Sequence, residues 1–230
     1  TVDNTQELEA GDVHAIGELH KTLDGVRKEL GRAVIGQTEV IDQLLMCLAA
    51  RGHALLMGVP GLAKTLLVSK LAECLSLDFN RIQFTPDLMP MDITGTDILQ
   101  ETPGGERRFE FARGPIFANI VLADEINPVE QEGTYPLPEA QLDRFMFLIE
   151  VDYPTEEEEI TIARLTTGTE LPELNKLLDG EAVKEMQALV RRVPVPDHVY
   201  SYAVRLVRQT RPNSADAPEW LKPLVSWGAG

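Results

Sequence analysis

The sequence predicts an α/β fold in which helices flank a parallel sheet and a small all-helical domain follows. Short apolar runs alternate with helical segments up to about Tyr153, which is typical of a parallel sheet covered on both faces. A glycine-rich segment, Gly58 to Thr65, lies between one such run and a helix. After about Thr155 the apolar spacing is purely helical, so we place a domain boundary near Tyr153 and Pro154.

The spacing of apolar residues defines each element in order. Steps of three and four predict a helix from about residue 12 to residue 30, which Gly31 is expected to end, and a second helix after Gly36 and Gln37. Segments 96–99 and 107–111 flank a Pro-Gly-Gly turn and predict a hairpin. The predicted strands of the sheet are 53–57, 80–84, 120–123 and 146–150. We divide the chain into a loose segment 1–11, an α/β domain 12–153 and a partial helical domain 154–230.

The composition limits the function. The chain has 230 residues and a formal net charge of -16, and so acidic a chain repels phosphate backbones, which disfavours a nucleic-acid motor. Cys47 and Cys74 lie in apolar helical patterns and are expected to be buried thiols. The histidines show no metal-ligand spacing, so no metal other than magnesium is expected. Because the sequence has no apolar run of about 18 residues and no signal-peptide pattern, we expect a cytoplasmic protein without a membrane span.

The segment Gly58-Val-Pro-Gly-Leu-Ala-Lys-Thr65 predicts a site for the phosphates of ATP. Glycines let a tight turn present its backbone N–H groups to phosphate, and the following helix directs its positive end there. Lys64 can reach the outer phosphates, and the Thr65 hydroxyl can coordinate magnesium. Ala63 replaces the usual last glycine, so we expect a negative φ at this position. The predicted nucleotide-binding residues here are Gly58, Val59, Pro60, Gly61, Leu62, Ala63, Lys64, Thr65 and Leu66.

A second segment, Ile120-Val-Leu-Ala-Asp-Glu125, predicts the chemistry that follows binding. An apolar strand delivers two carboxylates to the carboxyl edge of the sheet, where ligands bind in open α/β folds. Asp124 is expected to bind magnesium and so the nucleotide, through water, and Glu125 to activate the attacking water as general base. An acidic pair alone is weak support, but it becomes strong support here because the pair lies about sixty residues after the phosphate loop.

Several longer motifs, in the same order, resemble the MoxR family of AAA+ ATPases. Besides the phosphate loop, they are Met91-Asp-Ile-Thr-Gly95, Arg113-Gly-Pro-Ile-Phe-Ala-Asn119, Leu122-Ala-Asp-Glu-Ile-Asn127 and the stretch from Glu130 to Phe145. The resemblance is close from Val34 to Tyr153 and looser beyond. It implies an AAA+ nucleotide-binding domain with a helical lid, bound ATP or ADP with Mg2+, and hydrolysis of ATP. Alanine is usual at position 63 in this family.

The resemblance also implies roles that the residues alone do not show. Val34, Ile35, Gly36 and Gln37 match the stretch beside the adenine. Arg144, in Leu-Asp-Arg-Phe, matches the arginine finger that acts on a neighbouring subunit's nucleotide, where a guanidinium can stabilise charge on the transferred phosphoryl group. A homo-oligomeric ring, commonly a hexamer, is therefore implied, with a client protein complex and a partner bearing a von Willebrand factor A domain. The predicted hairpin resembles an insert that lines or caps such rings.

The sequence departs from the family pattern at Asn127. The family has a further helix and strand there, ending in a sensor asparagine before a proline, whereas Asn127 runs directly into Pro128. A strand cannot be lost from a sheet interior without exposing the hydrogen-bonding edges of its neighbours. We therefore expect residues to be missing at this point and leave Asn127 unassigned. The match also ends before the family's second sensor arginine.

Two further function classes stay open beside a chaperone-like ATPase that remodels, assembles or activates client complexes. The motor subunit of a metal chelatase shares this architecture, and a tetrapyrrole-synthesis partner would identify it. A nucleotide-gated scaffold would bind ATP but barely turn it over. The presence of Lys64, Asp124, Glu125 and Arg144 argues against the scaffold, and a turnover assay decides. Neither the client nor the ring size follows from the sequence.

Overall fold

A computed structural model describes residues 10–101, 107–126, 139–167, 172–226 and 228–229. Contacts divide the chain into two units, one of residues 14–190 and one of residues 1–13 together with 191–230. The larger unit holds every strand in the described ranges. The domain boundary near Tyr153 stays a prediction. None of the helices in these ranges combines the length and the apolar character that crossing a bilayer requires.

The core of the larger unit forms among helices α1 (Ala10–Ala33), α2 (Thr38–Ala49), α3 (Lys64–Cys74) and α7 (Gly180–Val190). Both cysteines are buried and free, as predicted. The expected end of α1 at Gly31 is wrong, because the Val34 N–H still donates to the Leu30 carbonyl at 2.9 Å; one helical glycine costs only about 1 kcal/mol. The helical core residues include Val26, Leu30, Val40, Ile41, Leu45, Leu67, Leu71, Cys74, Val183 and Met186.

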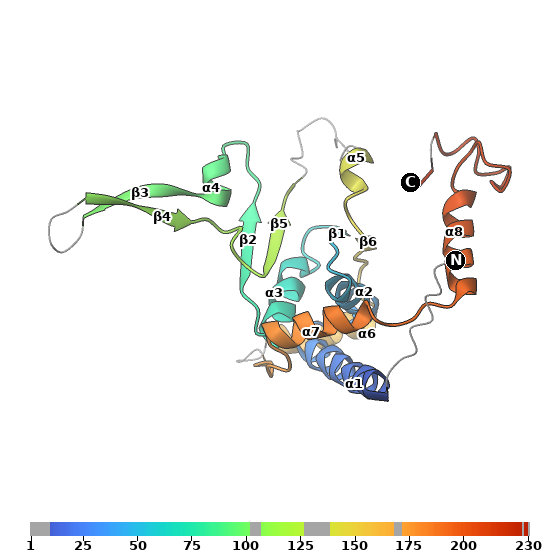
Figure 1. Cartoon of the computed structure of the whole chain (residues 1–230). Coiled ribbons are helices and arrows are strands. Elements are labelled where there is room, and N and C mark those ends of the chain that lie inside the picture. The colour runs from blue at the N-terminus through green and yellow to red at the C-terminus, as the bar shows by residue number, and fades with distance from the viewer. Residues whose placement is uncertain (1–9, 102–106, 127–138, 168–171, 227, 230) are drawn as a thin grey trace. The chain divides into compact units, whose positions relative to one another are not determined.

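The parallel strands form two separate pairs. They are β1 (Ala54–Met57), β2 (Phe79–Gln83), β5 (Ile120–Asp124) and β6 (Phe147–Glu150). Strand β1 pairs with β6, and β2 pairs with β5. Figure 1 shows them in the spatial order β2, β5, β1, β6, and within the described residues no ladder joins β5 to β1. The parallel α/β arrangement is thus confirmed, but in the described residues the parallel strands form two pairs rather than one continuous ladder.

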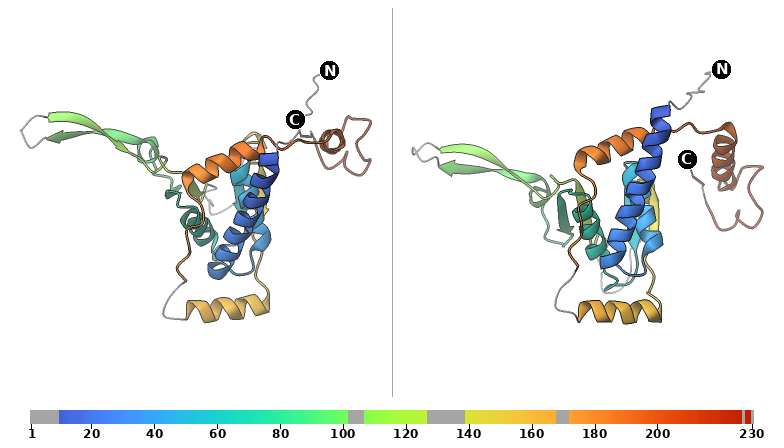
Figure 2. Two further views of the ribbon diagram at one scale, coloured as in Figure 1. Left: turned by 60° about the horizontal axis from the view of Figure 1, so that its bottom comes forward. Right: turned by 90° about the horizontal axis from the view of Figure 1, so that it is seen from below.

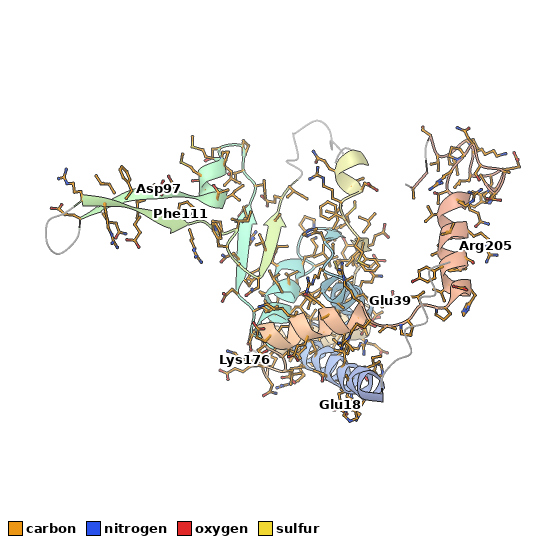
Figure 3. All side chains as sticks on the ribbon, viewed as in Figure 1. Glu18, Glu39, Asp97, Phe111, Lys176 and Arg205 are labelled. Atoms are coloured by element: carbon orange, nitrogen blue, oxygen red, sulfur yellow. The ribbon has the colours of Figure 1, made fainter. Side chains whose placement is uncertain are left out.

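The predicted hairpin is confirmed and projects from the larger unit. Helix α4 (Pro90–Thr94) leads into β3 (Gly95–Glu101), which pairs antiparallel with β4 (Arg107–Arg113). Figure 2 shows the pair extending away from the helices of this unit. Asp97 and Phe111, labelled in Figure 3, are register partners on the two strands. Nearly all residues of both strands are exposed, so few contacts within this unit hold the arm.

Two short helical elements bracket β6 in the chain, and one helix lies in the smaller unit. Helix α5 (Glu139–Leu142) precedes β6, and α6 (Glu156–Thr166) follows it. Four glutamates, Glu156 to Glu159, lie in the first turn of α6, where acids offset the helix dipole. A capping box joins Thr155 to Glu158, whose carboxylate accepts from the Thr155 N–H at 2.8 Å. Helix α8 (Asp197–Gln209) belongs to the smaller unit.

Candidate functional site

The phosphate loop connects β1 to α3 and depends on two glycines. Gly58 has a φ of 154°, and a Cβ there would lie 2.5 Å from the Val151 carbonyl oxygen. Gly61 has a φ of 92°. Residues with side chains rarely adopt such dihedrals, and at Gly58 the close approach of backbone excludes them as well. The loop therefore has the glycine-dependent turn, followed by a helix N-terminus, that the sequence predicts for phosphate binding.

Lys64 is the first residue of α3 and folds back over the loop. Its Nζ donates to the carbonyl oxygens of Gly58 at 2.7 Å and Val59 at 2.8 Å. Among the described residues, two backbone carbonyls thus hold the ammonium group at the loop. A phosphate placed in the loop would meet this charge directly.

The expectation of a negative φ at Ala63 is wrong. Ala63 caps α3 in the left-handed region, with φ 53° and ψ 24°, where a residue with a Cβ is strained by about 1–2 kcal/mol. Its carbonyl accepts the Leu67 N–H at 2.9 Å, so the first bond of the helix holds the position. Backbone strain of this kind is concentrated at functional sites.

The acidic pair lies at the carboxyl end of β5, and β2 holds both carboxylates. Arg81 lies with its Nη2 2.6 Å from Asp124 Oδ2, and its Nε donates to the same oxygen at 2.8 Å. Gln83 Nε2 donates to Glu125 Oε2 at 2.9 Å. Glu125 itself has a φ of 55°. Like Ala63, it is a strained residue with a side chain at the predicted site.

Sequence reasoning missed Arg81 and Gln83. Both point to one face of β2, because side chains alternate along a strand. The register pairs Arg81 with Leu122 and Gln83 with Asp124, so this face of β2 lies beside the acidic end of β5. Only the pairing of β2 with β5 reveals this. The sequence signal was a basic and an amide residue spaced two apart in a predicted strand.

The stretch expected beside the adenine lies partly in the core and partly at a cavity. Val34 is buried in the core. Gly36 and Gln37 line a cavity of about 570 Å³ with residues of β6 and the segment after it, among them Glu150, Asp152 and Tyr153. Gln37 Nε2 donates to the Asp152 carbonyl at 3.2 Å. The cavity carries three carboxylates, from Glu39, Glu150 and Asp152, so it suits hydrogen-bond donors better than anions.

Arg144 lies just after α5 and is exposed. Its N–H donates to the Gln141 carbonyl at 3.3 Å. Within the part of the chain that the structure describes, its guanidinium forms no ion pair, in contrast to Arg81. A surface ion pair, the ordinary role of an arginine, is therefore not its role among these residues.

The structure places the predicted site residues in separate local groups. Lys64 lies on the phosphate loop, and the acids are held by β2. No hydrogen bond or ion pair among the described residues joins the loop to the acids or to Arg144, although α3 contacts β5. The Thr65 hydroxyl and the Asp124 carboxylate are oxygen donors, which magnesium prefers. The described residues contain no cluster of three or more acids, histidines or cysteines that could hold a metal ion.

Comparison with known proteins identifies the family. Residues 53–127 and 126–147 match the model of the ATPase family associated with various cellular activities (AAA). The chain is 36% identical to YeaC of Bacillus subtilis, over 84% of this chain and 72% of that protein. It is also 36% identical to Chaperone MoxR1 of Mycobacterium tuberculosis, over 92% of this chain and 65% of that protein. The chain belongs to the MoxR family of AAA+ ATPases.

A solved structure gives the same result for the MoxR-family fold. The crystal structure of a candidate ATPase from Cytophaga hutchinsonii superposes with a TM-score of 0.74 and 32% sequence identity. The superposition covers 94% of this chain and 79% of that one. The chain is thus an AAA+ protein with chaperone-like relatives, and it spans about two thirds of Chaperone MoxR1.

The alignments also bear on the break at Asn127. The two matched pieces of the family model meet at residues 126 and 127. The alignment with YeaC runs over 234 positions but includes 84% of the 230 residues here, about 193, which leaves about 41 positions without a residue from this chain. Relatives therefore carry a segment for which this sequence has no counterpart. Asn127 itself lies outside the described residues.

Proposed function

We propose that this MoxR-family chain binds ATP with magnesium and hydrolyses it to ADP and phosphate. The observation that carries the proposal is the phosphate loop. Its glycine-dependent turn ends at the N-terminus of α3, and Lys64 is folded over it at 2.7 and 2.8 Å from two loop carbonyls. Membership in a family of ATPases supports the same reaction.

Each residue then has a distinct role. Lys64 and the loop N–H groups of residues 58–66 bind the phosphates. Thr65 and Asp124 bind Mg2+, which supplies charge neutralisation at the transferred phosphoryl group. Glu125 accepts a proton from the attacking water, and Gln83 fixes the orientation of its carboxylate at 2.9 Å. Residues 34–37 lie beside the adenine.

We further propose that Arg144 completes the site of a neighbouring subunit. Its exposed guanidinium has no ion-pair partner among the described residues, as expected for a group that acts across an interface. A homo-oligomeric ring, in our proposal a cytoplasmic hexamer, would then use ATP to remodel client protein complexes. The relative named Chaperone MoxR1 supports a chaperone-like role. A partner with a von Willebrand factor A domain is part of this proposal.

Two substitutions test binding and hydrolysis separately. Lys64→Ala should abolish ATP binding, because the outer phosphates lose their only fixed cation on the loop. Glu125→Gln should leave ATP affinity near that of the wild type and lower turnover by about 10²-fold or more, the usual share of a general base. Calorimetry measures the affinity, and phosphate release measures the turnover.

Lys70→Ala is the matched control for Lys64→Ala. Lys70 lies on the same helix but pairs with Glu73 at 2.7 Å, so its loss should leave ATP affinity unchanged. Normal ATP affinity in Lys64→Ala would refute the phosphate-loop assignment. Wild-type turnover in Glu125→Gln would mean that another residue activates the water.

A nucleotide-gated scaffold is the second candidate, and one observation favours it. Arg81 occupies the Asp124 carboxylate that would otherwise serve magnesium, and the sheet between the loop and the acids is divided. Such a protein would bind ATP without completing the hydrolytic arrangement. Phosphate release by the wild-type chain at saturating ATP and Mg2+ decides: a rate no higher than that of ATP and Mg2+ without protein identifies the scaffold.

A further inference from the structure

Both carboxylate oxygens of Asp124 already have partners within the chain. Arg81 Nε donates to Asp124 Oδ2 at 2.8 Å, and Arg81 Nη2 lies 2.6 Å from the same oxygen. The other oxygen, Oδ1, accepts from the Glu125 N–H at 3.1 Å. A carboxylate oxygen has two lone pairs, so two nitrogens of one guanidinium are enough to occupy Oδ2. The predicted magnesium ligand is therefore engaged on both of its oxygens.

Strand β2 brings Arg81 to this carboxylate. The register of β2 against β5 (Figure 1) sets Arg81 opposite Leu122, two residues before Asp124. Two residues span about 6–7 Å along a strand, which the long arginine side chain covers. Gln83 of the same strand donates to Glu125. Strand β2 thus directs a cation to the predicted metal ligand and a neutral amide to the predicted general base.

A guanidinium and a magnesium ion compete for one carboxylate. Water bound to the metal must donate to an oxygen of Asp124, and the Arg81 guanidinium occupies Oδ2. A positive charge beside the ion also repels it. The ion pair can be displaced at small cost, because the Arg81 and Asp124 side chains are 43% and 27% exposed and exposed ion pairs contribute little to stability.

We propose that Arg81 is a latch on Asp124: it holds the carboxylate in the absence of magnesium and releases it when Mg2+ binds with the nucleotide. The inference rests on the proposed function, since it takes Asp124 as a magnesium ligand. A bound Mg2+ carries two charges and the guanidinium one, so the ion has the stronger attraction for the carboxylate. Arg81 thereby sets the Mg2+ concentration that nucleotide binding requires. It is a positioning residue, because it acts only through Asp124.

A second arginine–aspartate pair shows what a purely structural role predicts. Arg208 Nε lies 2.9 Å from Asp216 Oδ2, with side chains 52% and 45% exposed. Both residues belong to the smaller unit and to none of the predicted site segments. If both pairs are structural, losing either arginine changes stability alone. The latch predicts that only the loss of Arg81 changes the magnesium dependence of nucleotide binding.

Calorimetry of ADP binding to the full chain at a series of free Mg2+ concentrations tests the latch. ADP is the probe because the chain does not hydrolyse it. Arg81→Gln should lower the Mg2+ concentration at the midpoint of the change in ADP affinity by about two- to fivefold, the range that a partly exposed ion pair supports. Arg81→Lys keeps the charge but loses the planar fork, so its midpoint should lie between these two. Arg208→Gln should match the wild type.

A double-mutant cycle isolates the pair. Asp124→Asn leaves no carboxylate to hold, so adding Arg81→Gln to it should not move the Mg2+ midpoint. A shift that persists in this background overturns the latch, as does an unchanged or higher midpoint in Arg81→Gln alone. If Arg81→Gln fails to fold, an unchanged midpoint in Arg81→Lys has the same meaning. ADP affinity that is independent of Mg2+ in every variant overturns the metal role of Asp124 as well, which separates failure of the proposed function from failure of the latch.

Discussion

The half of the sheet that carries the phosphate loop and the half that carries the acidic pair differ in how they are supported. Strand β6, beside β1, buries Ile149 at 1% exposure next to Val151 at 4%, and α3 buries Leu67 and Leu71. The β2–β5 pair buries only Ile82 in its strands. The loop thus adjoins the packed core of the larger unit, and the acids lie on a strand pair that is less buried.

The two halves also differ in which residues hold their site side chains. Lys64 is held by carbonyls of its own loop, so the phosphate-binding geometry needs no other strand. Asp124 and Glu125 are held by Arg81 and Gln83 of β2. Nucleotide binding should therefore survive changes that impair hydrolysis, and the substitutions of Arg144 and Gln83 below test that separation.

The largest effect should come from Arg144, which is exposed and forms no ion pair with either half among the described residues. Arg144→Ala should keep ATP affinity near the wild-type value and lower turnover by about 10³-fold or more, as for arginine fingers in GTPases. Turnover per subunit in the wild type should rise with protein concentration as the ring forms. Calorimetry and phosphate release at several protein concentrations measure both quantities.

Mixing two inactive variants distinguishes action across an interface from a local defect. An Arg144→Ala subunit lacks the proposed arginine finger, and a Glu125→Gln subunit lacks the proposed general base. In a mixed ring, some interfaces pair an intact Glu125 with an intact Arg144 from the neighbour, so activity should partly return. No recovery despite demonstrated co-assembly would show that Arg144 acts within its own subunit or only structurally.

The sequence predicted the phosphate-loop half in detail because its determinants are local. Glycines at 58 and 61, a lysine and a following helix lie within one short segment, and the structure has the expected turn there. The acids were predicted for the same reason, as the end of one apolar strand. Only the sign of φ at Ala63 was wrong, because the first hydrogen bond of the helix forms around a conformation that alanine alone disfavours.

The partners of the acids could not be predicted, because they depend on strand pairing. Arg81 and Gln83 lie some forty residues before Asp124 and Glu125 and reach them only when β2 pairs with β5. The division of the sheet was not predicted; the motif order at Asn127 indicated only that residues are missing there, since losing a strand exposes its neighbours' edges. That the two inner strands, β5 and β1, are less buried than the outer ones also required the coordinates.

A smaller effect is expected for Gln83, the amide that orients Glu125. Gln83→Ala should lower turnover at saturating ATP by about tenfold, a fraction of the full share of a general base, because the carboxylate loses its donor at 2.9 Å. ATP affinity should not change. Gln83→Glu keeps the shape but repels Glu125, and its turnover should fall at least as far. A rise in turnover in Gln83→Ala would mean that Gln83 holds Glu125 away from the water.

The smallest effect should arise in the phosphate loop, at Ala63. The left-handed φ of 53° strains alanine by about 1–2 kcal/mol, whereas glycine adopts it without strain. Glycine also gives the unfolded chain more conformational entropy, which lowers the stability of the folded protein by about 0.5–1 kcal/mol. Ala63→Gly should therefore raise the free energy of unfolding by no more than about 1 kcal/mol, as measured by urea denaturation. Ala72→Gly, in the interior of α3 at 1% exposure, should lower it by about 1 kcal/mol or more. Equal losses in both variants would show that position 63 does not keep its left-handed conformation in solution.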